Sequence, residues 1–251
     1  MRLPWLRRDR DPRHHRALRI AAATAGAVAG ASGLAVLGVR LLRRPHPLAG
    51  RVALVAGVGR EGLGIEVARE LGRHGARLTL IGPDAAALDE ARADLAARGM
   101  EVATVACDLA SRGAVDRAVA EVTARVEHVD VLVNDCTTLD AAGVVHTTSA
   151  LLPQMRAREE GQLVTLTNRL ATVGFSEGLE ADLRGSGVHV TTVIAGPVDA
   201  AGVRDDARRV VHAIQRRERT VALGWRARLG RLAQALSPPL ASSLLHPAAA
   251  T

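Results

Sequence analysis

The stretch RVALVAGVGREGLG, residues 51–64, decides the fold. Residues 52–55 form a short apolar run that is typical of a buried strand. Four glycines follow this run: Gly57, Gly59, Gly62 and Gly64. From residue 65 the apolar positions recur at helical spacing, so the stretch predicts a strand, a glycine turn and a helix. Because helix N–H groups face a phosphate at such a turn, we expect a dinucleotide pyrophosphate here; a plain strand-to-helix turn is the alternative.

The composition of the 251 residues fits one α/β domain with an appendage. Hydrophobic residues make up 48%, so aliphatic side chains can supply the core. The chain has no tyrosine and no lysine, and its 33 basic residues are therefore all arginines, with a net charge of +7. No stripe of alternating basic and aromatic residues is present, of the kind that binds single-stranded nucleic acid. We interpret the arginines as a surface coat and expect no nucleic-acid partner.

Cys107 and Cys136 are the only cysteines. Neither belongs to a CxxC pattern or has the spacing of a metal-ligand pair. We expect reduced, packed thiols, with no disulfide and no metal site.

Downstream of the glycine loop, strand-like and helix-like segments alternate. Apolar runs at 77–81, 102–106 and 129–134 predict further strands, and Asp84 and Ser111 are expected to cap the helices between them. Strands separated by such helices indicate βαβ units with right-handed crossovers. The sequence therefore predicts an α/β fold, a Rossmann-type doubly wound parallel sheet with ligands at the carboxyl ends of its strands.

Residues 51 to 225 resemble the short-chain dehydrogenase/reductase family. The resemblance is carried by VALVAGVGREGLGIEVARELGRHGARLTL at 52–80, CDLAS at 107–111, DVLVNDC at 130–136 and SEGLEADLRGSGVHVTTVIAGPVDA at 176–200. It implies an NAD(P)-dependent oxidoreductase that acts on a small-molecule substrate, which the sequence does not identify.

The same resemblance implies a cofactor site. It assigns the pyrophosphate to the loop glycines, with Gly59 and Arg60 in the same loop, the adenine to Asp108, and support of the nicotinamide half to Asn134. Arg60 can meet a 2′-phosphate, and Gly82 stands where NAD enzymes have an acid, so the sequence favours NADP weakly over NAD.

The chain departs from the family pattern in the same regions. Four residues, 58–61, separate the first two motif glycines, one more than the family has. The family's Asn-Asn-Ala-Gly is replaced by Asn134-Asp135-Cys136-Thr137, and Ala195 replaces a proline of the loop that touches the nicotinamide. Because these positions contact the cofactor in the family, the changes are expected to alter how this chain holds it.

The catalytic part is the largest departure. The family uses a Ser, a Tyr and a Lys, and this chain has no Tyr or Lys. The Ser position falls at Thr167-Asn168, and only seven positions lead from there to Phe175, too few for the usual loop and helix start. We also expect a shortening between residues 137 and 151, so the sheet is predicted to be shortened on its active-site side, with no catalytic residue of the family's kind.

A relocated acid–base group is the alternative. His146 lies near Asp135, Cys136 and Asp140 in sequence, and a His-Asp or His-Cys pair can do acid–base work. An ordinary surface loop explains the same residues.

The N-terminal region divides into a basic segment, 1–19, a predicted transmembrane helix, 20–42, and a linker, 43–50. Residues 20–39 carry no charge, and a helix of that length spans about 30 Å, the thickness of a bilayer core. A cleaved signal peptide is the main alternative. Arginines flank the span on both sides, although more precede it, so its orientation stays open. We expect a membrane-associated protein with a single N-terminal span and a cytoplasmic domain.

A Rossmann domain like that of the family is expected at residues 51–224, followed by an amphipathic C-terminal helix and tail at 225–251. Trp225, Leu229, Leu232 and Leu236 share one helical face, which either lies on a membrane surface or packs on the domain itself. Two functions follow from the sequence: an NAD(P)-dependent oxidoreductase with an impaired or absent catalytic centre, or a catalytically dead relative that serves as a nucleotide-binding, regulatory or scaffold protein.

Overall fold

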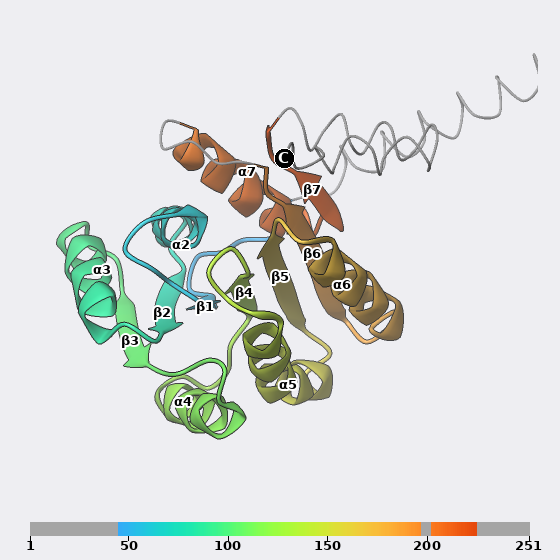
Figure 1. Ribbon diagram of the computed structural model, residues 1–251, viewed down its shortest axis with the longest axis horizontal. Helices are drawn as coiled ribbons and strands as arrows, with labels where there is room; N and C mark the ends of the chain where they lie inside the picture. The colour runs from blue at the N-terminus through green and yellow to red at the C-terminus, as the bar shows by residue number, and fades with distance from the viewer. Residues whose placement is uncertain (1–44, 197–201, 225–251) are drawn as a thin grey trace, which may run out of the picture. The chain divides into compact units, whose positions relative to one another are not determined.

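The computed structural model describes residues 45–196 and 202–224, which form a seven-stranded parallel sheet with helices on both faces (Figure 1). The strand order is β3-β2-β1-β4-β5-β6-β7. The strands are β1 (Val52–Ala56), β2 (Arg77–Gly82), β3 (Val102–Ala106), β4 (Val131–Asp135), β5 (Gly161–Thr167), β6 (Val188–Ile194) and β7 (Thr220–Ala222). The helices are α2 (Leu63–Arg73), α3 (Ala85–Ala97), α4 (Arg112–Arg125), α5 (Ala141–Ala157), α6 (Leu170–Asp182) and α7 (Val203–Gln215). The predicted Rossmann-type architecture is confirmed.

The sheet separates two apolar layers. Helices α2, α3 and α7 pack on one face, where Leu71, Leu95 and Val210 are buried. Helices α4, α5 and α6 cover the other face, which buries Val119 and Leu151. The strands β1 and β4 are buried along their whole length because they lie in the middle of the sheet with helices on both sides.

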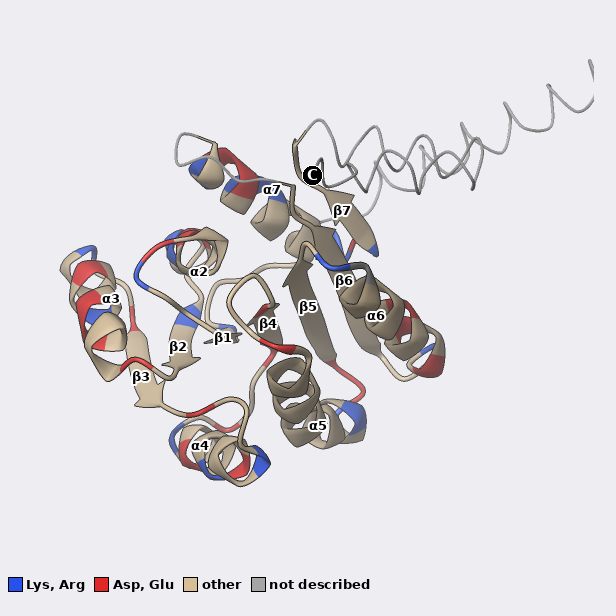
Figure 2. Ribbon diagram, in the orientation of Figure 1, with Lys and Arg blue, Asp and Glu red and all other residues tan. Residues whose placement is uncertain are grey.

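The helices carry charged residues of both signs, as Figure 2 shows. Many of these charges pair along one helix, for example Arg98 with Asp94 and Arg125 with Glu121. In the described part of the chain, arginines are therefore interleaved with acids, which agrees with a surface coat.

No helix within residues 45–196 and 202–224 is long and apolar enough to cross a bilayer. On this finding, the predicted membrane location is wrong. The longest of these helices, α5, has 17 residues, fewer than the roughly 20 that a span needs. This corrects the expected single-span, membrane-associated protein with a cytoplasmic domain. The segments 1–19 and 20–42 and the C-terminal helix and tail at 225–251 lie outside the described residues.

Helix α5 corrects the predicted shortening between residues 137 and 151. It begins at Ala141, where the Asp140 carboxylate accepts the Gly143 N–H at 2.8 Å as an N-cap. This helix is not predicted from the sequence because its first turns contain a glycine and two threonines, which are weak helix formers. Thr147 is accommodated by donating its hydroxyl to the Gly143 carbonyl at 2.8 Å.

Helix α6 follows β5 almost directly. It begins at Leu170, so only residues 168–169 separate it from the strand. The short connection that the sequence predicts after β5 is therefore present, and no loop or extra helical turn intervenes.

An ionic cluster holds the amino ends of the central strands. Asp130, just before β4, is 6% exposed; its carboxylate accepts hydrogen bonds from Arg51 at 3.0 Å, Arg158 at 2.9 Å and the Val52 N–H at 2.9 Å. Burial by itself raises the pKa of Asp130, but the Val52 N–H and the two guanidiniums outweigh it and hold that pKa below its usual value. The cluster ties β1 to β4 at the end of the sheet opposite the glycine loop.

Candidate functional site

The glycine loop connects β1 to α2 and needs glycine for two different reasons. Gly57 has a φ of 85°, and a Cβ there would lie 2.6 Å from the Leu139 Cγ and 2.8 Å from the Thr138 Oγ1. Gly62 has a φ of 120° and is the N-cap of α2, but nothing lies within 4 Å of its Cβ position. Gly57 thus allows close packing against the loop after β4, whereas Gly62 allows a backbone conformation and leaves open space in front of the helix.

Gly64 contacts a carboxylate of the protein itself. Its N–H donates to the Asp135 Oδ2 at 3.0 Å, and a Cβ at Gly64 would collide with the same oxygen. The other carboxylate oxygen accepts the Thr137 N–H at 3.0 Å. Asp135 is 2% exposed, and burial raises its pKa although the bonds from Thr137 and Gly64 oppose that shift. Sequence reasoning missed this contact; its one signal was the acid in place of the second Asn of the family pattern.

A cavity of about 340 Å³ opens beside the glycine loop. It lies between the carboxyl ends of β1, β2 and β3 and the segment after β4, which is where ligands bind in open parallel sheets. Its volume is in the range of small-molecule sites. Its lining consists of Gly57, Val58, Gly59, Arg60, Pro83, Asp84, Ala87, Asp108, Leu109, Ala110, Thr138, Leu139 and Asp140.

The charged residues that line this cavity are mostly acidic: Asp84, Asp108 and Asp140 against Arg60. Arg60 is the one basic residue among its lining residues, and its guanidinium forms ion pairs with Glu90 and, at 3.8 Å, with Asp84. Asp108 is exposed and accepts the Ala110 N–H at 3.0 Å, so it also stabilises its own turn. To bind the 2′-phosphate of NADP, the Arg60 guanidinium would have to leave Glu90 and Asp84.

Asn134 lies apart from the cavity lining. It is 1% exposed and joins β4 to α5: its Nδ2 donates to the Thr148 Oγ1 at 3.2 Å, and its Oδ1 accepts from the Thr147 Oγ1 at 2.7 Å. The structure therefore brings Gly57, Gly59, Arg60 and Asp108 around one cavity. Gly62 and Gly64 lie at the start of α2, and Asn134 is a buried bridge.

The end of β5 offers little acid–base chemistry. Thr167 is fully buried, and its Oγ1 accepts the Arg169 N–H at 3.0 Å, so its hydroxyl is part of the turn into α6. Asn168 and Arg169 are exposed beside it. Arginine stays protonated at neutral pH, so it does not exchange protons.

His146 does not assemble a relocated acid–base site. Its Nδ1 lies 3.1 Å from the Leu109 carbonyl oxygen, whereas Asp140 caps α5 and Asp135 caps α2. Burial, with the nearby charge of Asp135, raises the pKa of Cys136 to about 12, which keeps this thiol protonated. No cluster of three or more His, Cys, Asp or Glu side chains in the described ranges has the arrangement of a metal site.

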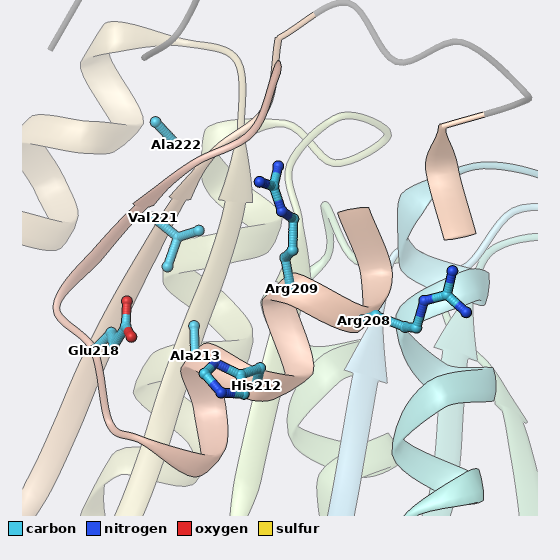
Figure 3. Close-up of a pocket in the computed structure, with 7 residues that line it drawn as sticks. All are labelled: Arg208, Arg209, His212, Ala213, Glu218, Val221 and Ala222. Atoms are coloured by element: carbon cyan, nitrogen blue, oxygen red, sulfur yellow. The ribbon is translucent and has the colours of Figure 1, made fainter. Parts of the chain in front are cut away.

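A second cavity, of about 350 Å³, lies between α7 and β7 (Figure 3). Arg209, His212 and Glu218 line it, and Figure 3 shows Arg208 pointing away from Arg209. Arg208 pairs with Asp205 on the same helix. This cavity shares no lining residue with the glycine-loop cavity.

Comparison with known proteins agrees with this architecture. Residues 51–140 match the short chain dehydrogenase family. The BbsC subunit of (2S)-[(R)-hydroxy(phenyl)methyl]succinyl-CoA dehydrogenase from Thauera aromatica is 29% identical over 184 residues, which cover 60% of this chain and 74% of that protein. These matches show that residues 51–140, and a larger part of the chain at lower identity, are similar to the short-chain dehydrogenase/reductase family.

Further proteins of this family show a similar likeness. Dehydrogenase/reductase SDR family member 7B from Bos taurus is 31% identical over 176 residues, which cover 54% of each chain. The crystal structure of a metagenomic short-chain oxidoreductase in complex with NADP superposes with a TM-score of 0.61 at 24% identity, covering 70% of this chain and 98% of that one. The likeness to that structure concerns the fold.

Proposed function

We propose that this chain is a member of the short-chain dehydrogenase/reductase family that binds a nicotinamide dinucleotide beside its glycine loop and has an impaired or absent catalytic centre. One observation carries the proposal: the glycine-loop cavity is present at the carboxyl ends of β1, β2 and β3, while the end of β5 holds no proton donor for a carbonyl substrate. A role as a regulatory or scaffold protein that binds nucleotide is the second candidate, and the absence of Tyr and Lys favours it.

The residues at the loop fit such a ligand. The open space at Gly62 faces the start of α2, so a pyrophosphate there meets backbone N–H groups, and a Cβ would fill part of that space. Pro83, Ala87 and Leu109 offer apolar contacts to an adenine, and Asp108 is the acid beside it. A bound nicotinamide supplies hydride chemistry; the chain's own residues bind and orient it.

Substitution of Gly62 is expected to abolish dinucleotide binding. Gly62→Val places a β-branched side chain at a φ of 120°, where L residues are strained by about 1–3 kcal/mol, and fills the space before the helix. Gly178→Val is the matched control, because Gly178 lies on the exposed side of α6 outside the cavity lining, has no positive φ, and has no atom within 4 Å of its Cβ position. Calorimetry with NADH and NADPH should show binding to the wild type and the control only. Equal binding by Gly62→Val would remove the loop as the site.

The choice between NADP and NAD is expected to depend on Arg60. Arg60→Ala should weaken NADPH more than NADH, because Arg60 is the one cation among the residues that line the cavity. Glu90→Gln should do the opposite and tighten NADPH, since it frees the guanidinium from its present partner. Parallel titrations with both cofactors test this. Equal changes for NADPH and NADH in both variants would show that Arg60 does not reach the 2′-position.

A further inference from the structure

The start of α2 already holds an anion, the carboxylate of Asp135. This residue is the last of β4, and its Oδ2 accepts the Gly64 N–H inside the first turn of the helix. Its other donors, the N–H and hydroxyl of Thr137, come from the segment after β4. The carboxylate is 2% exposed, so little water screens it.

The charge of this carboxylate faces no described counter-ion. Its hydrogen-bond donors are neutral, and within the described ranges no arginine or histidine forms an ion pair with it. The positive end of the α2 dipole, equivalent to roughly half a unit charge, is the balancing partner. One buried negative charge exceeds that half charge, so the helix start is left with a net negative charge.

We propose that Asp135 is an internal competitor of phosphate at the glycine loop and sets the affinity of this chain for phosphate-bearing nucleotides. The proposal rests on the dinucleotide site proposed above. Asp135 holds one of the N–H groups of the helix start and repels a pyrophosphate that approaches the groups beside it. The repulsion acts on phosphate and spares the nucleoside, because an adenosine carries no charge.

Replacement of the carboxylate tests the proposal. Asp135→Asn keeps the shape and an acceptor oxygen while removing the charge. Two unit charges a few Å apart in a poorly solvated site repel strongly, so NADH, ADP and inorganic pyrophosphate are expected to bind at least about tenfold more tightly to this variant. Adenosine is expected to bind both proteins equally.

Two further variants make the test sharper. Asp116→Asn removes one negative charge from the exposed face of α4 and should leave every affinity unchanged. Asp135→Ser removes the same buried charge with a smaller side chain, and serves if Asp135→Asn folds poorly in thermal denaturation. Each variant is titrated by calorimetry with the four probes on the full chain.

The outcomes separate this proposal from the proposed function. If wild type binds NADH and neither Asp135 variant binds NADH, ADP or pyrophosphate more tightly, the dinucleotide site stands and Asp135 is only a helix cap. If wild type binds none of the probes and Asp135→Asn binds ADP and NADH, competition by Asp135 is upheld and cofactor binding by the natural chain is overturned. If no folded variant binds any phosphate probe, both are overturned. Equal gains for adenosine and ADP would also overturn the phosphate-specific role.

Discussion

Purified protein is expected to oxidise NADH and NADPH no faster than a buffer blank with ketones, aldehydes and quinones. General acid–base catalysis contributes about 10²–10⁴-fold and needs a titratable group within hydrogen-bond reach of the transferred proton. This chain lacks Tyr and Lys, and the hydroxyl of Thr167 at the end of β5 is buried and bonded to the Arg169 backbone. Absorbance at the nicotinamide band over a range of protein concentrations measures the rate.

Single substitutions that introduce Tyr or Lys after β5 should not restore turnover. Helix α6 starts at Leu170, so the turns that would carry both side chains toward one substrate are missing. A rate that rises in proportion to protein concentration with any of these substrates would contradict the prediction. His146 is then the first residue to replace, because its Nδ1 lies 3.1 Å from the carbonyl oxygen of Leu109, a residue that lines the cavity.

Asp130→Ala is expected to lower the free energy of unfolding by about 3 kcal/mol at pH 7. Removing one partner of a buried ion pair leaves uncompensated charge, which costs roughly 3–5 kcal/mol; Arg51 and Arg158 are about a quarter exposed, so the lower end applies. Urea denaturation of both proteins measures the difference. Asp89→Asn, an exposed acid paired with Arg92 on α3, is the control and should change stability by less than about 0.5 kcal/mol.

The difference in the free energy of unfolding between wild type and Asp130→Ala is expected to become smaller as the pH falls. The pKa of Asp130 is lower in the folded protein than in the unfolded chain, so its contribution is present above the unfolded value of about 4. It is lost as the pH falls through the lower folded pKa. The gap between wild type and Asp130→Ala should therefore shrink in acid below about pH 4. A gap that stays constant down to pH 2 would show that Asp130 acts through packing alone.

The fold could be predicted because its signals are local. Runs such as 52–55 and 129–134 are apolar and short, and the segments between them have helical spacing, so the strands and their parallel order follow from the chain. Helix α5 could not be predicted in this way. Its start depends on the Asp140 cap and on packing of Thr147 against Asn134, a contact between residues from two different elements.

The site could be predicted only in part, for a similar reason. The glycines and Asp108 are recognisable from their motifs, but Thr138 and Leu139 reach the cavity only because β4 lies next to β1. The ion pair of Arg60 with Glu90 joins a loop to α3, and the bond of Asp135 to Gly64 joins β4 to α2. Such contacts decide the charge of the site. They join residues far apart in the chain, so motif spacing does not predict them.

The position of β1 in the sheet also constrains how a nascent chain can fold on the ribosome. On one side β1 pairs with β2, which follows it closely, but its other neighbour is β4, where Ala53 meets Val131. Until residues 131–135 have been synthesised, one edge of the strand VALVA has unpaired N–H and C=O groups and no apolar cover, which makes it a template for association with other chains. A pause in translation between β3 and β4 thus leaves this edge open to misassembly.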